Sequence, residues 1–141
     1  MKLILTIFTF FFMITAGAQD LSSHQWQDRV LLVITDDSSN VIFKRQLAEL
    51  NQNKDKLKER KLVIYQVKQN SFRKGLDNGK WQAGSQIFNE FIKPPSTFRI
   101  VLLGLDGGEK LNQAEFLTAE QLFAVIDVMP MRKAEIRKKG R

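Results

Sequence analysis

The segment "LLVITDDSSNVIFKRQL" (31–47) contains a polar loop of the kind in which α/β proteins often hold a nucleophile or a phosphate. An apolar run of strand length leads into the loop, and an amphipathic run of helical spacing follows it. The chain has no cysteine, which excludes thiol redox chemistry, thiolate metal sites and cysteine nucleophiles. The loop offers instead Asp36, Asp37, Ser38, Ser39 and Asn40.

Two chemical interpretations of this loop are weak. A serine hydroxyl needs a base within hydrogen-bond reach, and the one histidine, His24, would have to approach Ser38 or Ser39 without any nucleophile-elbow motif. Asp36 and Asp37 lack the further oxygen ligands that Ca²⁺ or Mg²⁺ requires. We therefore expect no metal and no cofactor, and an exposed or hydrogen-bonded His24.

The favoured interpretation of the loop is structural. Asp37, Ser38 or Asn40 is expected to cap the following helix, which stabilises a helix by about 1 kcal/mol.

Asp127 is the second carboxylate of interest, because it falls in the last turn of the final expected helix, where the helix dipole is unfavourable to it. This position suggests a partner. We predict that Asp127 pairs with Arg132 or accepts backbone N–H groups. In the alternative interpretation Asp127, Met129 and Met131 form a docking surface, since methionine suits adaptable contacts.

The elements that must position these residues follow a β-α-β-α-β-β-α order. The aliphatic runs "RVLLVIT" (29–35) and "KLVIYQV" (61–67) are typical of buried strands, and the helical pattern between them predicts parallel pairing. A loop around Gly75 and Gly79 and a helix over 80–92, ended by "KPP", come next.

The second half of the chain adds two strands and a helix. "TFRIVLLGL" (97–105) is the third strand, and "DGG" (106–108) predicts a tight hairpin into "EKLNQ". Thr118 and Gln121 predict a capping box, and Pro130 is expected to stop the last helix. This order, with a mixed central sheet, is that of the thioredoxin fold, although a ferredoxin-like or other small α/β sandwich is an alternative. Pro95 is the candidate cis-proline.

Three segments carry a closer resemblance: "WQDRVLLV", "LLGLDGGEKL" and "LFAVIDVMPMRKAEI". They are similar to exported, peroxiredoxin-like domains of unknown function, which stand alone in bacteria and occur in the animal sushi-repeat-containing proteins and a coiled-coil-named matrix protein. The resemblance implies a thioredoxin-type fold, export and, in animals, extracellular adhesion, and it assigns no catalytic residue. Its motif residues are Gly104, Asp106, Gly107, Asp127, Met129, Pro130, Met131 and Arg132.

The N-terminus resembles a secretory signal peptide. Lys2, an apolar run and "AGA" (16–18) fit this pattern, with Gln19 as the expected mature N-terminus. An uncleaved anchor is the alternative, and the missing cysteine excludes a lipoprotein. We therefore expect a signal peptide over 1–18, a domain over 19–131 and a basic tail over 132–141, in a periplasmic or extracellular protein.

The net charge of +7 is concentrated in the tail. Without Lys2 and the tail the chain carries only +1, so no nucleic-acid-binding face is expected. The tail could contact anionic phospholipid or an acidic partner, or it could be a solvated, disordered terminus. Its cations are Arg132, Lys133, Arg137, Lys138, Lys139 and Arg141.

The expected function is a non-enzymatic binding or scaffold domain of the cell envelope, with an unidentified protein or anionic envelope component as partner. One alternative is an enzyme or enzyme accessory that uses the Asp36–Asn40 loop beside Pro95, where thioredoxin-like folds form a groove. The other is an envelope-stress factor that acts through the basic tail.

Overall fold

Two parallel strands form the centre of the sheet, as the aliphatic runs predict. In the computed structural model, which describes residues 21–77 and 79–140, β1 (Arg29–Thr35) is buried along its whole length. It pairs in parallel with β2 (Leu62–Val67), with Val30 opposite Val63. The predicted signal peptide (1–18) and Arg141 lie outside the described residues.

The sheet is mixed and has six strands in the order β4-β3-β2-β1-β5-β6. β5 (Phe98–Leu103) runs antiparallel to β1 and continues through a hairpin into β6 (Glu109–Gln113). Gly107 has a φ of 79° in the turn, and the Gly104 N–H donates to the Gly108 carbonyl at 2.9 Å. The predicted mixed sheet and the glycine hairpin are both confirmed.

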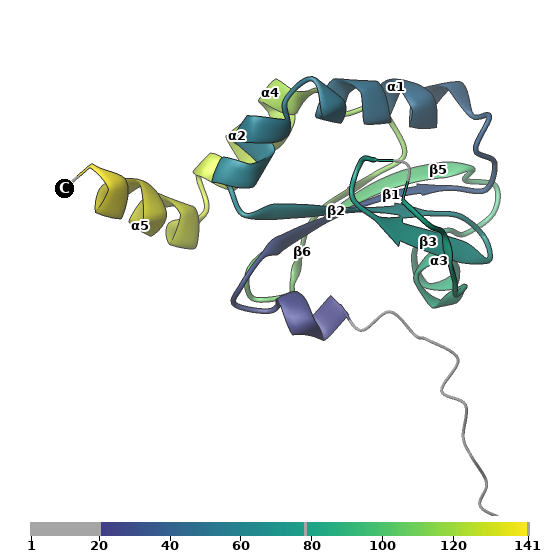
Figure 1. Ribbon diagram of the computed structural model, residues 1–141, viewed down its shortest axis with the longest axis horizontal. Coiled ribbons are helices and arrows are strands. Elements are labelled where there is room, and N and C mark those ends of the chain that lie inside the picture. Colours follow the sequence, from purple (N-terminus) through teal and green to yellow (C-terminus); the bar gives the residue numbers. More distant parts are fainter. Residues whose placement is uncertain (1–20, 78, 141) are drawn as a thin grey trace, which may run out of the picture.

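Helices cover both faces of this sheet (Figure 1). α1 (Val41–Asn51), α2 (Lys54–Glu59) and α4 (Ala119–Asp127) lie on one face, and α3 (Gln86–Phe91) lies on the other with the short 3-10 helix η1 (Leu21–His24). Because side chains alternate along a strand, β1 supplies Leu31 to one core and Leu32 to the other. None of the helices within the described residues is long and apolar enough to span a membrane.

The helix predicted from the first loop onward is divided in two. α1 ends at Asn51, and α2 starts at Lys54. Between them the Asn53 side-chain amide donates to the Glu49 carbonyl at 2.9 Å. Asparagine side chains compete in this way with the helix hydrogen-bond pattern, which explains the break.

The predictions of a loop before residue 80 and of a helix over 80–92 are partly wrong. β3 (Ser71–Lys74) and β4 (Gln82–Ala83) form a small antiparallel extension of the sheet, and the helix is shortened to α3. Trp81 therefore lies outside the helix, with Lys68 and Arg73 over its ring at 4.0 and 4.6 Å. Gly84 disfavours a helix, and its N–H donates to the Asn70 carbonyl instead.

Proline at position 130 begins a helix as well as following one. α4 ends at Asp127, and its predicted capping box at Thr118 and Gln121 is present. α5 (Pro130–Lys139) then starts with Pro130 in its first turn, where the missing N–H costs nothing. Residues 130–139 are thus helical rather than a disordered terminus, and Arg132, assigned to the tail from the sequence, is 2% exposed.

Candidate functional site

The polar loop after β1 is used for local structure. Asn40 is the cap of α1: its side-chain oxygen accepts the N–H groups of Ile42 and Phe43 at 2.9 and 3.1 Å. Asp37 accepts the hydroxyl and the N–H of Ser39 at 2.7 and 2.9 Å, and these hydrogen bonds lower the pKa of Asp37. The capping prediction is therefore confirmed for Asn40.

The same loop lies beside the proline segment, as expected. The Pro94–Pro95 bond is cis, and the Asp36 N–H donates to the Thr97 carbonyl at 3.1 Å. The side chains of 36–39 and of Pro95 are exposed, and none of these residues lines the pocket described below.

His24 lies elsewhere and is occupied. It is buried, its Nε2 is 2.7 Å from the Tyr65 hydroxyl, and its Nδ1 is 2.9 Å from the Asp28 carboxylate. A Ser–His pair with the loop is thus contradicted, and the expected hydrogen-bonded histidine is confirmed as a buried one. No group of three or more metal-ligating side chains occurs in the part of the chain that the structure describes.

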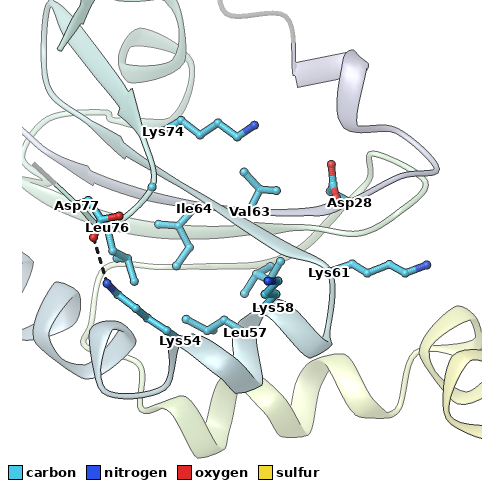
Figure 2. Close-up of a pocket in the computed structure, with 12 residues that line it drawn as sticks. Asp28, Lys54, Leu57, Lys58, Lys61, Val63, Ile64, Lys74, Leu76 and Asp77 are labelled. Carbon is cyan, nitrogen blue, oxygen red and sulfur yellow. Dashed lines mark hydrogen bonds and ion pairs between the residues drawn. The ribbon is translucent and has the colours of Figure 1, made fainter. Parts of the chain in front are cut away.

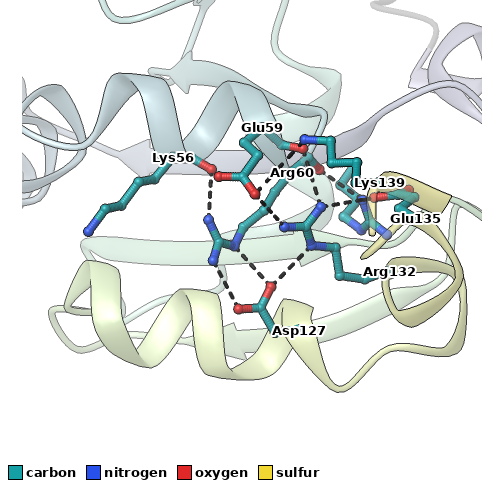
Figure 3. Close-up of polar contacts among 8 residues, drawn as sticks. Lys56, Glu59, Arg60, Asp127, Arg132, Glu135 and Lys139 are labelled. Carbon is teal, nitrogen blue, oxygen red and sulfur yellow. Dashed lines mark hydrogen bonds and ion pairs between the residues drawn. The ribbon is translucent and has the colours of Figure 1, made fainter. Parts of the chain in front are cut away.

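Asp127 is held by two arginines (Figure 3). Arg60 donates to it through Nε and Nη2 at 3.0 and 2.9 Å, and Arg132 Nε donates at 3.2 Å. The predicted Asp127–Arg132 pair is confirmed. Hydrogen bonds from Arg60, and then from Arg132, lower the pKa of Asp127 although partial burial acts in the opposite direction.

Two further carboxylates complete this arrangement, which we call the arginine cluster. Arg132 also donates to Glu59 at 3.1 Å and to Glu135 at 3.4 Å, which raises the pKa of Arg132 despite its burial. Glu135 in turn accepts from the fully buried Arg29 at 3.3 Å. The cluster consists of Arg29, Arg60, Arg132, Glu59, Asp127 and Glu135, and it ties α5 to β1, α2 and α4.

Most members of the cluster could not be found from the sequence. Arg60 is 67 positions from Asp127, and Glu135 is 106 positions from Arg29. Beyond the Asp127–Arg132 pair, the one further signal was the charged Arg29 at the start of an otherwise apolar strand. Arg60 is also positioned by the Phe123 ring, whose centroid is 4.1 Å from its guanidinium carbon.

An apolar pocket of about 450 Å³ adjoins this cluster, and we call it the motif pocket. The segments that carry the family resemblance meet here, although they are far apart in the sequence. Trp26 and Met131 at its edge are 63% and 50% exposed. The lining residues are Trp26, Arg29, Gly104, Leu105, Asp106, Lys110, Met129, Pro130 and Met131.

Gly104 lies against the Asp106 and Lys110 side chains on the hairpin side of the motif pocket. A Cβ atom on Gly104 would lie 2.6 Å from Lys110 Cε and 3.1 Å from Asp106 Oδ1. The missing side chain thus leaves room for the Asp106–Lys110 ion pair, which is 2.9 Å long and lowers the pKa of Asp106. Gly107 serves the turn itself, through its positive φ.

Trp26 has an unusual backbone conformation for a bulky residue, with a φ of 66°. Its N–H donates to the Leu105 carbonyl of the hairpin at 2.6 Å, which holds the residue beside the pocket. Strained residues of this kind occur preferentially at functional sites.

The sheet order, the helices on both faces and the cis-proline beside the first helix define a thioredoxin-like domain. A crystal structure of the reduced 2-Cys peroxiredoxin of Plasmodium vivax is similar to this chain, with a TM-score of 0.57 and 15% sequence identity. The match covers 81% of this chain and 84% of that one. At this identity the likeness concerns the fold.

The chain belongs to the family described as Domain of unknown function (DUF4174), whose model matches residues 20–135. No curated protein matches the chain. With no cysteine in the sequence, the chain has no thiol for the chemistry that peroxiredoxins perform.

Proposed function

We propose that this chain is a non-enzymatic binding domain of the cell envelope, and that it holds a protein partner by an apolar side chain inserted into the motif pocket. The observation that carries this proposal is the meeting of all three resemblance segments at one apolar pocket. A volume of about 450 Å³ is sufficient for a large side chain of a partner.

The residue types around the motif pocket support binding rather than catalysis. Tryptophan and arginine are enriched among the residues that dominate binding energy, and methionine adapts to varied apolar partners. Trp26 and Met131 are exposed at the pocket edge, while Met129 is partly buried. With the apolar lining of the pocket these side chains form one local apolar surface, and such surfaces are common at interaction sites.

The arginine cluster supports the same role, because it holds the start of α5, which forms one wall of the motif pocket. Arg132 lies one residue after Met131 and is bonded to three carboxylates. A wall held rigid before binding reduces the conformational entropy that association would otherwise cost.

The experiment compares capture of partners from envelope extract by the purified protein and its variants. Trp26→Ala combined with Met131→Ala should lose most of the captured protein. Val41→Ala combined with Ile42→Ala is the matched control, because these residues are also apolar and exposed but lie at the start of α1. Equal capture by both double variants would contradict the proposal.

A second candidate function rests on α5, whose last turn is basic and which extends away from the sheet (Figure 1). Exposed cations near an anionic membrane contribute about 1 kcal/mol each. Charge removal at Lys133, Arg137, Lys138 and Lys139 should abolish sedimentation with anionic vesicles if this helix is the binding element. The export on which both candidates depend rests on the predicted signal peptide.

The enzyme alternative at the Asp36–Asn40 loop has less support, because its side chains cap α1 or bind one another. Peroxidase and disulfide-reductase assays of the purified protein should both be negative. Activity in either assay would contradict the non-enzymatic role.

A further inference from the structure

A second pocket, of about 430 Å³, lies between α2 and the end of β3, and it shares no lining residue with the motif pocket (Figure 2). We call it the lysine pocket. Its lining combines aliphatic side chains with four lysines. The residues are Asp28, Lys54, Leu57, Lys58, Lys61, Leu62, Val63, Ile64, Lys74, Gly75, Leu76 and Asp77.

The pocket exists because β3 is shorter than β2. Pairing between the two strands begins at Tyr65 and Lys74, so β3 does not extend alongside the first half of β2. Gly75 then turns the chain with a φ of 93°, and its N–H donates to the Ile64 carbonyl at 2.7 Å. This turn leaves a hollow between β2 and α2.

The floor of the hollow is aliphatic. Leu57 projects from α2, Ile64 from β2 and Leu76 from the chain after β3, all toward the same face of the sheet (Figure 2). Val63 also lines the pocket but lies on the opposite face of β2. Leu76 is only partly buried, so apolar surface remains open to a ligand on this face. A pocket of 300–1,000 Å³ with an apolar lining and a few polar groups is typical of small-molecule sites.

The rim carries an excess of unpaired positive charge. Lys54 forms an ion pair with Asp77 at 3.0 Å, and Asp28 is bonded to His24. Among the described residues the ammonium groups of Lys58, Lys61 and Lys74 have no hydrogen-bond or ion-pair partner. Three ammonium groups around a hollow produce a positive potential that concentrates anions.

Lys61 is also held in an uncommon backbone conformation. Its φ is 51°, and its carbonyl accepts the Arg29 N–H at 2.8 Å. Lys61 directly follows Arg60, the C-cap residue of α2, and a left-handed residue at this position is a common way for a helix to end. This conformation fixes where the Lys61 side chain leaves the backbone.

We propose that the lysine pocket binds a free anionic amphiphile, with one apolar chain and a carboxylate or similar anionic head. The chain lies on Leu57, Ile64 and Leu76, which share one face of the sheet. The head is bound by Lys58 and Lys61, and Lys74 adds positive charge from the other face of the sheet. Free phosphate would leave the aliphatic floor exposed, and a neutral lipid would leave the lysines unpaired, so the combination selects an amphiphile.

The test is calorimetric titration of the purified protein with dodecanoate, below the concentration at which it forms micelles. We expect saturable binding at one site. Dodecyltrimethylammonium, which has the same chain and a cationic head, and inorganic phosphate should bind far more weakly. Binding of either as tight as that of dodecanoate would overturn the proposal.

Variants separate the lysine pocket from the surface in general. Replacement of Lys58, Lys61 and Lys74 by glutamine should weaken dodecanoate binding roughly tenfold or more. The same loss of charge at Lys44, Lys80 and Lys93, which are exposed and outside the pocket, should leave it unchanged. Equal weakening by both triple variants would overturn the assignment.

Two further measurements complete the test. Leu76→Asn keeps every lysine and should also weaken dodecanoate binding, since it places an amide on the apolar floor. Sedimentation with phosphatidylglycerol vesicles distinguishes a membrane headgroup from a free amphiphile. Vesicle binding that depends on the three lysines, without binding of dodecanoate, would overturn the proposal and indicate a membrane surface instead.

Discussion

The Asp36–Asn40 loop and the arginine cluster are opposite cases of polar residues in one small domain. The loop has the residue types and the position of an active site. Its side chains, however, form hydrogen bonds with groups only a few positions away in the sequence. The residues of the arginine cluster are dispersed along the sequence, but they join elements from both ends of the chain. Reactive residue types alone are therefore a poor guide to a site. Contacts between distant segments are a better one.

The comparison can be tested first at Arg132, where we expect the largest effect. Arg132→Ala removes a buried cation that neutralises three carboxylates. Breaking a buried ion pair typically costs 3–5 kcal/mol, and because the carboxylates are partly exposed we expect about 2–3 kcal/mol. Urea unfolding measures the loss. Lys133→Ala, its exposed neighbour, should change stability by less than about 0.5 kcal/mol.

The next largest loss of stability is expected at Asp127, and this loss should depend on pH. Asp127→Asn should lower the free energy of unfolding by about 1–2 kcal/mol near neutral pH, because Arg60 and Arg132 lose their charged acceptor. The pKa of Asp127 is lowered in the folded state, so its contribution is present above the unfolded pKa and is lost as pH falls through the folded one.

The difference between wild type and Asp127→Asn should therefore be constant at neutral pH and shrink below roughly pH 4. Thermal unfolding followed from pH 7 to pH 2.5 measures it. An equal difference at every pH would show that the charge of Asp127 does not stabilise the fold.

In the loop, Asn40 should have a smaller and purely structural effect. Asn40→Ala removes the acceptor for two N–H groups of α1 and should cost about 1 kcal/mol. Partner capture through the motif pocket should be unchanged. Loss of capture with an unchanged melting temperature would instead make the loop a binding element.

The smallest effect is expected at Ser38, which is exposed and is not the cap residue. Ser38→Ala should change the melting temperature by no more than a degree or two, because exposed substitutions usually lie within about 0.5 kcal/mol. Differential scanning calorimetry measures this change. A larger loss would show that the loop has a role that its hydrogen bonds do not indicate.

Local features of the fold were predictable for a local reason. The cap at Asn40, the capping box at Thr118 and the Gly107 hairpin each depend on residues within a few positions of one another. The helix that was predicted around Trp81 shows the limit of such patterns. Its apolar spacing fits a helix, but pairing of 82–83 with β3 and two cations over the indole ring decide its conformation.

The site was predictable only in part. Asp127 could be singled out, because a carboxylate at a helix C-terminus is unfavourable without a partner, and Arg132 was within reach along the chain. Arg60 and Glu135 could not be found in this way. Neither could the lysine pocket, because its lysines are unremarkable along the sequence and become neighbours only where β3 ends early.

The sequence by itself determined the class of fold and the absence of thiol chemistry. Both depend on composition and on periodic patterns, which are complete before the chain folds. The tertiary structure decided which charges neutralise one another and where the apolar hollows lie. Both depend on contacts between residues up to 106 positions apart. Such residues do not interact until the folded sheet brings them together, so local sequence patterns cannot reveal the contacts.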